Sequence, residues 1–494
     1  MAKEVNRARR VEFGDFQTPE SLARRVCLLL GAKGFRPASV VEPTCGTGSF
    51  LLAALDQFPE LNNVIGLDVN RDYLNLVEQR LAGRAYAGKV RTICASFFET
   101  DWPALIKDLP DPLLVIGNPP WVTNAALGSL GSSNLPIKSN FQNHRGLDSL
   151  TGKGNFDISE WMLLRVLEWL RGRKASMAFL CKTAVARKVL VHAWKNSLEP
   201  SRAEIFGLNA LEHFGASVDA CLLVCSFSSS ISDDASVYFD LDQARPTTTI
   251  GFRDGRLIAD TRLYDRWKHL EGPSIYKWRS GVKHDCAQVL ELQKTGSHYI
   301  NGLGEEIELE NTYLHPMLKS SDIANGHGAR PKRWMLVTQS RVGRDTTPIE
   351  RIAPKTWKYL CGHGPLLDAR ASSIYAKRPR FSVFGVGPYT FAPWKVAISG
   401  FYKKLTFSIV GPFDGRSVVF DDTCYFLACH NEREARCVCN LLNSEVAAEF
   451  YRAFLFWDAK RPITADLLNR LELNAVARAL DVPTTDLSIL SEYA

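Results

Sequence analysis

Short apolar segments alternate with helical patterns across residues 20–227, and this alternation restricts the fold more than any other feature of the chain. Between the segments, apolar side chains recur at three- and four-residue spacing, which predicts helices. Alternating strands and helices build a doubly wound α/β sheet of mainly parallel strands, with ligands at the carboxyl ends of those strands. The predicted strands are residues 39–42, 63–68, 90–94, 113–117 and 178–181, and the predicted helices include 50–55, 71–81 and 158–170.

The pattern changes near residue 210. Residues 210–214 and 220–227 are predicted to be two strands joined by a turn, which would add an antiparallel hairpin at the edge of the sheet. A chain of 494 residues is too long for one ordinary domain. We predict a first domain at 1–250, a connector at 251–290 and a second, mixed α+β domain at 291–494, with strands around 380–428 and helices around 432–456 and 464–480.

The positive charge of the chain is unevenly distributed. Residues 1–250 hold 27 Lys and Arg against 26 Asp and Glu, whereas residues 251–494 hold 33 against 27. Residues 351–404 alone hold ten basic residues and a single acidic one, Asp368. The excess favours a polyanionic partner for the C-terminal half. The alternative is a basic face that is merely solvated.

The twelve cysteines show no spacing typical of a zinc site. We therefore expect reduced thiols in a cytoplasmic protein, and no metal. No apolar run reaches the roughly 18 residues that a membrane-spanning helix needs, and the polar first ten residues are unlike a secretory signal. We expect no membrane partner.

A glycine-containing loop follows the first predicted strand, at residues 42–50. Gly46 and Gly48 let the backbone pass close to a ligand, and the following helix offers free N–H groups. The third glycine of the dinucleotide fingerprint is absent. Asp68 ends the next strand, where a carboxylate can accept hydrogen bonds from both hydroxyls of a ribose. The alternative role for Asp68, a helix N-cap, suits Asn70 better.

Asn118-Pro119-Pro120-Trp121 closes the predicted strand at 113–117. The two prolines remove two backbone donors and stiffen the turn. The amide oxygen of Asn118 and the carbonyl of Pro119 are then acceptors aimed at one point. Two such acceptors can hold both hydrogens of an exocyclic amine, which favours the pyramidal geometry in which its lone pair attacks. Trp121 supplies a flat face for stacking, although an ordinary proline turn with a core tryptophan is the alternative.

Residues 122–155 follow directly, and fifteen of these 34 are Gly, Ser or Asn without visible periodicity. Long loops of this kind are usually functional, so we predict a substrate-contacting loop. A disordered insertion is the alternative.

In this order, the motifs resemble the gamma-ordered, TaqI-like class I methyltransferases, which transfer a methyl group from S-adenosyl-L-methionine to the N6 amine of adenine in DNA. The resemblance covers most of the chain and implies a flipped adenine, direct transfer without a covalent intermediate, and a C-terminal target-recognition domain. Phe214 is similar to the family's second aromatic contact with the base, beside the catalytic Asn118, Pro119, Pro120 and Trp121. The implied cofactor-binding residues are Phe16, Thr18, Pro19, Glu42, Thr44, Gly46, Gly48, Asp68, Val69, Ser96, Phe97 and Asn118.

One position departs from the family. Ser96-Phe97 stands where the family has Asp-Phe, and that aspartate normally receives the adenine amine of the cofactor. We therefore predict weaker cofactor binding than is usual in the family, or a compensating contact.

Several segments of the C-terminal half are similar to TaqI-like recognition domains. Their basic, aromatic and glycine residues suit a surface that grips the phosphate backbone, or equally a role in domain stability. The expected partners are double-stranded DNA and, in a restriction-modification system, a separate cognate restriction endonuclease. The segments are residues 278–285, 315–323, 375–381, 385–389 and 394–396.

Three rival functions stay open. The same catalytic motif occurs in methyltransferases that act on RNA or on a protein glutamine amide. A combined restriction-modification enzyme would usually carry a nuclease domain before the methyltransferase, whereas here the cofactor segment is expected near residue 13. The substitution at Ser96 leaves a non-catalytic DNA-binding subunit as the third alternative.

Overall fold

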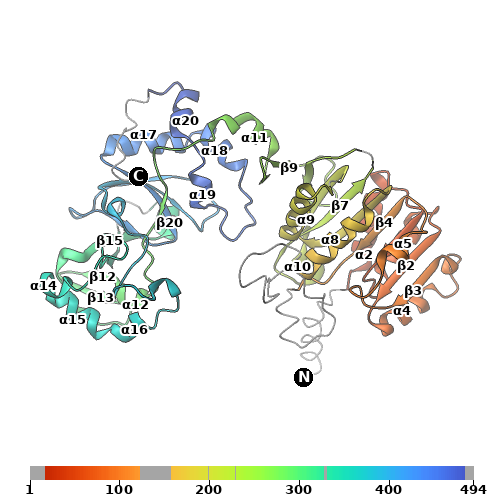
Figure 1. The fold of residues 1–494 in the computed structure, drawn as a ribbon, viewed down its shortest axis with the longest axis horizontal. Helices are drawn as coiled ribbons and strands as arrows, with labels where there is room; N and C mark the ends of the chain where they lie inside the picture. The colour runs from red at the N-terminus through yellow and green to blue at the C-terminus, as the bar shows by residue number, and fades with distance from the viewer. Residues whose placement is uncertain (1–16, 123–156, 199, 229, 327–330, 484–494) are drawn as a thin grey trace. The chain divides into compact units, whose positions relative to one another are not determined.

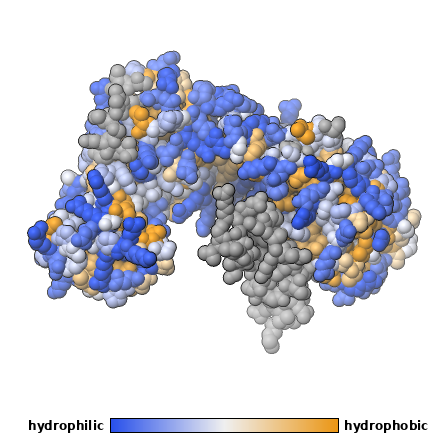
Figure 2. Space-filling model, viewed as in Figure 1, coloured by the Kyte–Doolittle hydropathy of each residue, from blue (hydrophilic) through white to orange (hydrophobic). Residues whose placement is uncertain are grey.

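The computed structural model describes residues 17–122, 157–198, 200–228, 230–326 and 331–483 (Figure 1). The chain divides into two compact units, Met1–Thr261 and Arg262–Ala494. The segment 251–290, expected to be a connector, is thereby split between them. Each unit has its own buried apolar core, and hydrophilic side chains cover much of the face seen in Figure 2.

The first unit is built on a ten-stranded mixed sheet in the order β10-β9-β8-β6-β7-β5-β4-β1-β2-β3. Its parallel part confirms the predicted doubly wound sheet, because β1 pairs with β2 and β4, and β4 pairs with β5, all in parallel. These strands are β1 (Ser39–Glu42), β2 (Asn63–Asp68), β3 (Val90–Cys94), β4 (Leu113–Gly117) and β5 (Ala175–Lys182).

Helices follow the strands as the apolar spacing predicts. The apolar sides of α2, α3 and α4 share one core with the strands, and α8 and α9 pack against each other and on β5. The helices are α2 (Glu20–Ala32), α3 (Ser49–Gln57), α4 (Arg71–Leu81), α5 (Trp102–Ile106), α8 (Ile158–Leu170) and α9 (Thr183–Lys195). Figure 1 labels five of these helices, α2, α4, α5, α8 and α9, along the sheet of the first unit.

The predicted strand at 210–214 is wrong, because this segment is the short helix α10 (Ala210–Phe214). Asn209 caps it by accepting a hydrogen bond from the Glu212 N–H at 3.3 Å, and Gly215 ends it with φ 65°, in the left-handed region. An N-cap residue and a C-terminal glycine stabilise the two ends of a helix, and here they favour a helix although the five residues between them read as a short apolar strand.

The hairpin partner of β7 (Asp219–Phe227) is therefore β6 (Arg202–Asn209), which pairs with it antiparallel. The sheet also continues beyond this hairpin, so the hairpin does not form its edge. The three additional strands are β8 (Asp234–Tyr238), β9 (Thr248–Arg253) and β10 (Arg256–Ile258).

The second unit contains two sheets and a group of helices. The four-stranded sheet has the order β11-β20-β17-β18, and the six-stranded sheet the order β14-β13-β12-β16-β15-β19. Its strands are β11 (Arg279–Ser280), β12 (Glu291–Thr295), β13 (His298–Asn301), β14 (Glu306–Ile307), β15 (Leu314–Leu318), β16 (Arg333–Leu336), β17 (Trp394–Ser399), β18 (Ser408–Val410), β19 (Val419–Phe420) and β20 (Cys424–Cys429).

The strands and helices expected near the C-terminus are present. A separate core holds the last four helices against the four-stranded sheet. They are α17 (Glu432–Leu442), α18 (Glu445–Arg452), α19 (Ala465–Leu468) and α20 (Leu473–Ala479).

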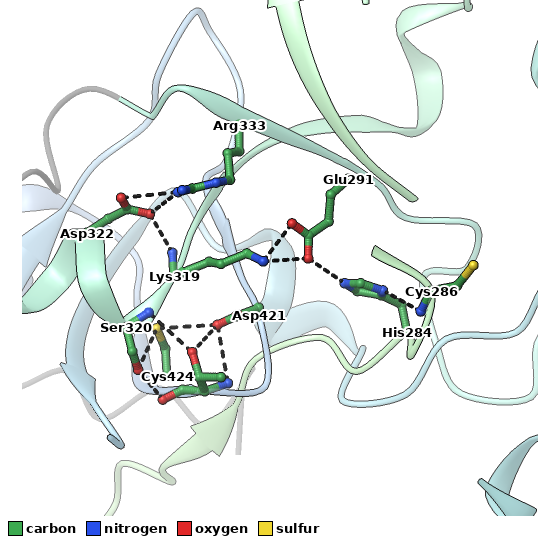
Figure 3. A network of polar contacts seen from close by, with 10 residues as sticks. His284, Cys286, Glu291, Lys319, Ser320, Asp322, Arg333, Asp421 and Cys424 are labelled. Carbon is green, nitrogen blue, oxygen red and sulfur yellow. Dashed lines mark hydrogen bonds and ion pairs between the residues drawn. The ribbon is translucent and has the colours of Figure 1, made fainter. Parts of the chain in front are cut away.

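Two of the segments that resemble recognition domains meet in a polar network (Figure 3). Both His284 and Lys319 approach the carboxylate of Glu291, at 3.3 and 2.7 Å. Although burial opposes it, the hydrogen bonds from His284 and Lys319 hold the pKa of Glu291 below its ordinary value. Asp322 pairs with Arg333 at 2.9 Å. These side chains therefore stabilise the second unit, and Lys319 already has a carboxylate partner.

Lys395 on β17 is a buried lysine, only 1% exposed, held by backbone carbonyls. Its ammonium donates to the carbonyls of Ala392 and Val418, at 2.6 and 2.8 Å. Burial lowers the pKa of Lys395 to about 7, because the low dielectric disfavours the charged form.

The lowered pKa of Lys395 makes the stability of the protein depend on pH. The folded pKa of Lys395 lies below the unfolded value, so between about pH 7 and pH 10.5 the unfolded chain binds more protons. The free energy of unfolding should therefore rise with pH across that window, by on the order of 1 kcal/mol per unit from this group. Urea unfolding of the wild type and Lys395→Met between pH 7 and 8.5 checks it. Equal pH slopes in the two proteins would refute the prediction.

Candidate active site

The predicted site residues gather where the central parallel strands end. β1 ends at Glu42, β2 at Asp68 and β4 at Gly117, and the registers place these ends at one edge of the sheet. A Cβ added at Gly117 would lie 3.8 Å from Cγ of Glu42, so the strand before Asn118 passes close to the glycine loop. The parallel topology thus unites motifs that are far apart in the sequence.

The glycine loop is joined to Asp68 by its backbone. The Gly46 N–H donates to Oδ2 of Asp68 and the Asn70 N–H donates to Oδ1, both at 2.8 Å. Gly46 and Gly48 have φ of 50° and 80°, values that residues with a Cβ rarely adopt. Asn70, and not Asp68, caps α4, because its side chain accepts from the Asp72 N–H at 3.0 Å. A carboxylate at this position is a group that can accept hydrogen bonds from the hydroxyls of a ribose.

The segment before α2 lies against the same loop. Gln17 accepts hydrogen bonds from the Thr47 N–H and hydroxyl, at 3.0 and 3.1 Å, and the Ser49 hydroxyl donates to the Thr18 carbonyl at 2.7 Å. Pro19 follows as the residue before α2. The structure therefore places Thr18 and Pro19 next to the loop, while Phe16 lies outside the described residues.

The residues around the loop fit the polar methionine part of the cofactor and its adenosine. Glu42 is buried, and its Oε2 accepts from the Leu51 N–H at 3.2 Å. Burial raises the pKa of Glu42 well above its ordinary value, and the nearby charge of Asp68 adds to the rise. The Thr44 hydroxyl is buried and has no hydrogen-bond partner among the described residues. Val69 leaves an apolar side chain 55% exposed beside Asp68.

Ser96, which stands where the similar methyltransferases have an aspartate, follows β3. Its hydroxyl accepts a hydrogen bond from the Phe98 N–H at 3.2 Å. The ring of Phe97 is buried in an aromatic cluster with Trp102, at 5.2 Å, and Trp169, at 5.4 Å. Phe97 is thus a core residue in this structure, and its contact with the cofactor stays a prediction.

Asn118, Pro119 and Pro120 follow β4 directly, and Trp121 closes the turn. The Trp121 ring is buried, and its indole N–H donates to the Leu180 carbonyl at 3.3 Å. Phe214, from α10, meets it edge to face, with ring centroids 5.1 Å apart and an interplanar angle of 71°. The structure therefore brings the two predicted base-contacting aromatic residues together.

Lys182, at the end of β5, also belongs to this site, although no sequence motif predicted it. Its ammonium donates to the main-chain carbonyl of Trp121 at 3.0 Å and to the Asp157 carboxylate at 2.6 Å. Asp157 also caps α8 by accepting from the Ser159 N–H at 3.1 Å, and the Ile158 N–H donates to the Val122 carbonyl at 2.9 Å. Lys182 therefore joins the turn at residues 118–121 to the start of α8.

The segment 122–155, predicted to contact substrate, lies outside the described residues except for Val122. Among the residues that are described, no three His, Cys, Asp or Glu side chains are placed to hold a metal ion. Within the same residues, no helix is both long and apolar enough to span a membrane.

The sheet, the loop and the motif that follows β4 define the class, a class I S-adenosyl-L-methionine-dependent methyltransferase. No family model matches the sequence. Type II methyltransferase M.NspV of Nostoc sp. (strain ATCC 29411 / PCC 7524) is 43% identical over 474 residues, which cover 95% of this chain and 98% of the relative. The chain belongs to this family of type II methyltransferases, the DNA methyltransferases of restriction-modification systems.

A solved structure shares the fold across both units. It is the Type IIL restriction-modification enzyme MmeI in complex with DNA, at a TM-score of 0.50 and 14% identity, covering 98% of this chain and 70% of that enzyme.

Proposed function

We propose that this methyltransferase modifies the N6 amine of an adenine that is flipped out of double-stranded DNA. The observation that carries the proposal is the convergence of Asn118-Pro119-Pro120-Trp121 with Phe214 at the sheet edge that also holds the glycine loop. An exocyclic amine is a poor nucleophile, because its lone pair is delocalised into the ring. The Asn118 amide oxygen and the Pro119 carbonyl are the acceptors that would hold its two hydrogens.

The bound cofactor supplies the electrophilic methyl group. Asp68 would hold its ribose, Thr44 and the glycine loop its methionine part, and Val69 an apolar face of the adenosine. The catalytic effect of this chain's own residues then lies mainly in orienting the amine toward that methyl group.

Flipping a base out of the duplex costs a few kcal/mol. Stacking on aromatic side chains offsets that cost by roughly 1–3 kcal/mol per base. Trp121 and Phe214 are the side chains proposed for this contact. Because Trp121 is only 6% exposed in this structure, its stacking requires a local opening when the base enters.

The substrate class is tested by incubating the full chain with cofactor labelled on its methyl group. Duplex DNA, duplex RNA of the same sequence and a protein carrying accessible glutamines are offered in separate reactions. We expect label in DNA alone. Label in RNA or in the protein instead would replace the proposal with the corresponding rival, and no cofactor binding at all would favour a non-catalytic subunit.

Ser96→Asp tests whether residue 96 contacts the adenine amine of the cofactor. A carboxylate there is expected to accept the adenine amine with a charge-assisted hydrogen bond, tightening cofactor binding about tenfold. Calorimetric titration of the wild type, Ser96→Asp and the uncharged control Ser96→Asn measures it. Equal affinity in all three would show that Ser96 is not a cofactor contact.

A further inference from the structure

Two exposed loops of the second unit, far apart in the sequence, carry basic side chains and lie next to each other. Arg341 and Arg344 lie on the loop after β16, and Lys377 and Arg378 lie on the loop before Phe381; all four are exposed. The loops touch, because a Cβ added at Gly343 would lie 3.5 Å from Nη1 of Arg378. We call these four residues the basic loop surface.

Buried polar side chains hold the two loops together. Thr338 and Thr346, each at most 2% exposed, donate to the carbonyls of Phe381 and Arg380, at 2.7 and 2.6 Å. Gln339, also 2% exposed, accepts from the Val383 N–H at 3.1 Å. These bonds cross from one loop to the other, so they hold the backbones of the two loops together.

The loop backbone is fixed in an uncommon conformation as well. Lys377 has φ of 60° and Phe381 has φ of 64°, in the left-handed region that residues with a Cβ seldom adopt. Such conformations persist where the surrounding structure imposes them, and they are common at binding sites.

The four cations lack carboxylate partners. Among the described residues, none of them forms an ion pair, whereas many other exposed cations of the unit do. Asp345 is the nearest acidic residue in the sequence, and its carboxylate accepts from Thr347. Arg344 donates to the Ser340 hydroxyl, and Arg378 lies over the Phe384 ring at 5.9 Å. The positive charge is therefore uncompensated and presented to solvent.

We propose that the basic loop surface holds the phosphate backbone of the DNA substrate. This inference rests on the proposed function only for the identity of the duplex. Arginine and lysine contacts with phosphate dominate the affinity of proteins for DNA and position the protein on the duplex without reading sequence. Guanidinium groups also match phosphate geometry with paired donors. The surface thus supplies affinity, and leaves base reading to other residues.

The salt dependence of DNA affinity reports the number of phosphate contacts, so it tests the proposed role directly. Each phosphate that a cationic side chain neutralises releases condensed counterions from the DNA, and this contributes about −0.9 to the slope of log affinity against log salt concentration. The full-length fourfold variant Arg341→Gln, Arg344→Gln, Lys377→Gln, Arg378→Gln is compared with the wild type on duplex DNA. We expect an affinity loss on the order of 100-fold at low salt and a slope smaller by about 3 to 4.

A matched control removes the same charge from the same unit. Lys268, Arg436, Arg452 and Arg478 are exposed and each pairs with a carboxylate. Replacing these four by glutamine should change affinity less than about fivefold and the slope by less than about one. Equal losses in both variants would overturn the inference, since net charge would then explain them.

The turnover number separates this inference from the proposed function. Methyl transfer by the wild type is measured beside the DNA binding of the fourfold variant of the basic loop surface. Unchanged affinity and slope in that variant, with a wild type that methylates adenine, would overturn the surface and leave the function standing. A wild type that binds DNA through these loops but methylates no adenine would overturn the function alone. The same comparison is made on duplex RNA. A loss of affinity for RNA without a loss of affinity for DNA would overturn the proposed DNA-binding role of the basic loop surface.

Discussion

Replacing Asn118 by alanine is expected to lower kcat for methyl transfer on the order of 1,000-fold, while cofactor and DNA affinity stay within a few fold of wild type. The side chain follows β4 beside the glycine loop, where its amide oxygen would accept one hydrogen of the target amine. Without that acceptor the lone pair stays delocalised in the ring, and only the Pro119 carbonyl remains to orient the amine.

Single-turnover rates with labelled cofactor measure this effect, and gel-shift and calorimetric titrations measure binding. Asn118→Asp is the informative second variant, because it retains an oxygen acceptor at the same place. Methylation by Asn118→Ala at more than a tenth of the wild-type rate would remove Asn118 from the catalytic role.

The second large effect is expected at Lys182. Lys182→Met deletes the ammonium that joins the Trp121 carbonyl to the Asp157 carboxylate, leaving the buried Asp157 without its cation. The turn that carries Asn118 would then lose an anchor at its far end. Small displacements of a positioned group cost up to about 100-fold in rate. We therefore expect kcat to fall by about 10- to 100-fold with less than about a threefold change in KM for DNA.

Two variants separate positioning by Lys182 from a general loss of stability. Lys188→Met breaks an ion pair with Glu160, at 2.9 Å, that joins α9 to α8, but among the described residues no hydrogen bond or ion pair joins Lys188 to the proposed catalytic motif. It should leave kcat unchanged. Lys182→Arg keeps the charge and the donors, so it should recover part of the rate. Equal losses of kcat in Lys182→Met and Lys188→Met would show that helix packing, and not the motif, is responsible.

The core of the first unit was predictable because its signals are local. Buried parallel strands appear as short apolar runs, and β1, β2 and β4 have the predicted bounds. The bounds of β3, a partly exposed strand at the edge of the sheet, also agree. The motifs at Glu42, Asp68 and Asn118 follow three of these strands, so a parallel sheet alone brings them together. The short helix at 210–214 escaped prediction because five apolar-rich residues carry too little periodicity, and its signals were Asn209 and Gly215.

The contacts that depend on tertiary structure could not be predicted. Lys182 acts on a main-chain carbonyl, which every residue has, so no residue type marks its partner. A charged residue at the end of an apolar strand was the only signal. The basic loop surface likewise combines Lys377 and Arg378, inside the basic stretch 351–404, with Arg341 and Arg344, which lie outside it.

The identity of the methylated nucleoside tests the central claim most directly. Duplex DNA treated with the purified chain and cofactor is digested to nucleosides and analysed by mass spectrometry, with Asn118→Ala as the blank. The proposed chemistry predicts N6-methyladenine as the product of the wild type, absent from the blank. A methyl group found on cytosine, or equal N6-methyladenine from the Asn118→Ala variant, would contradict it.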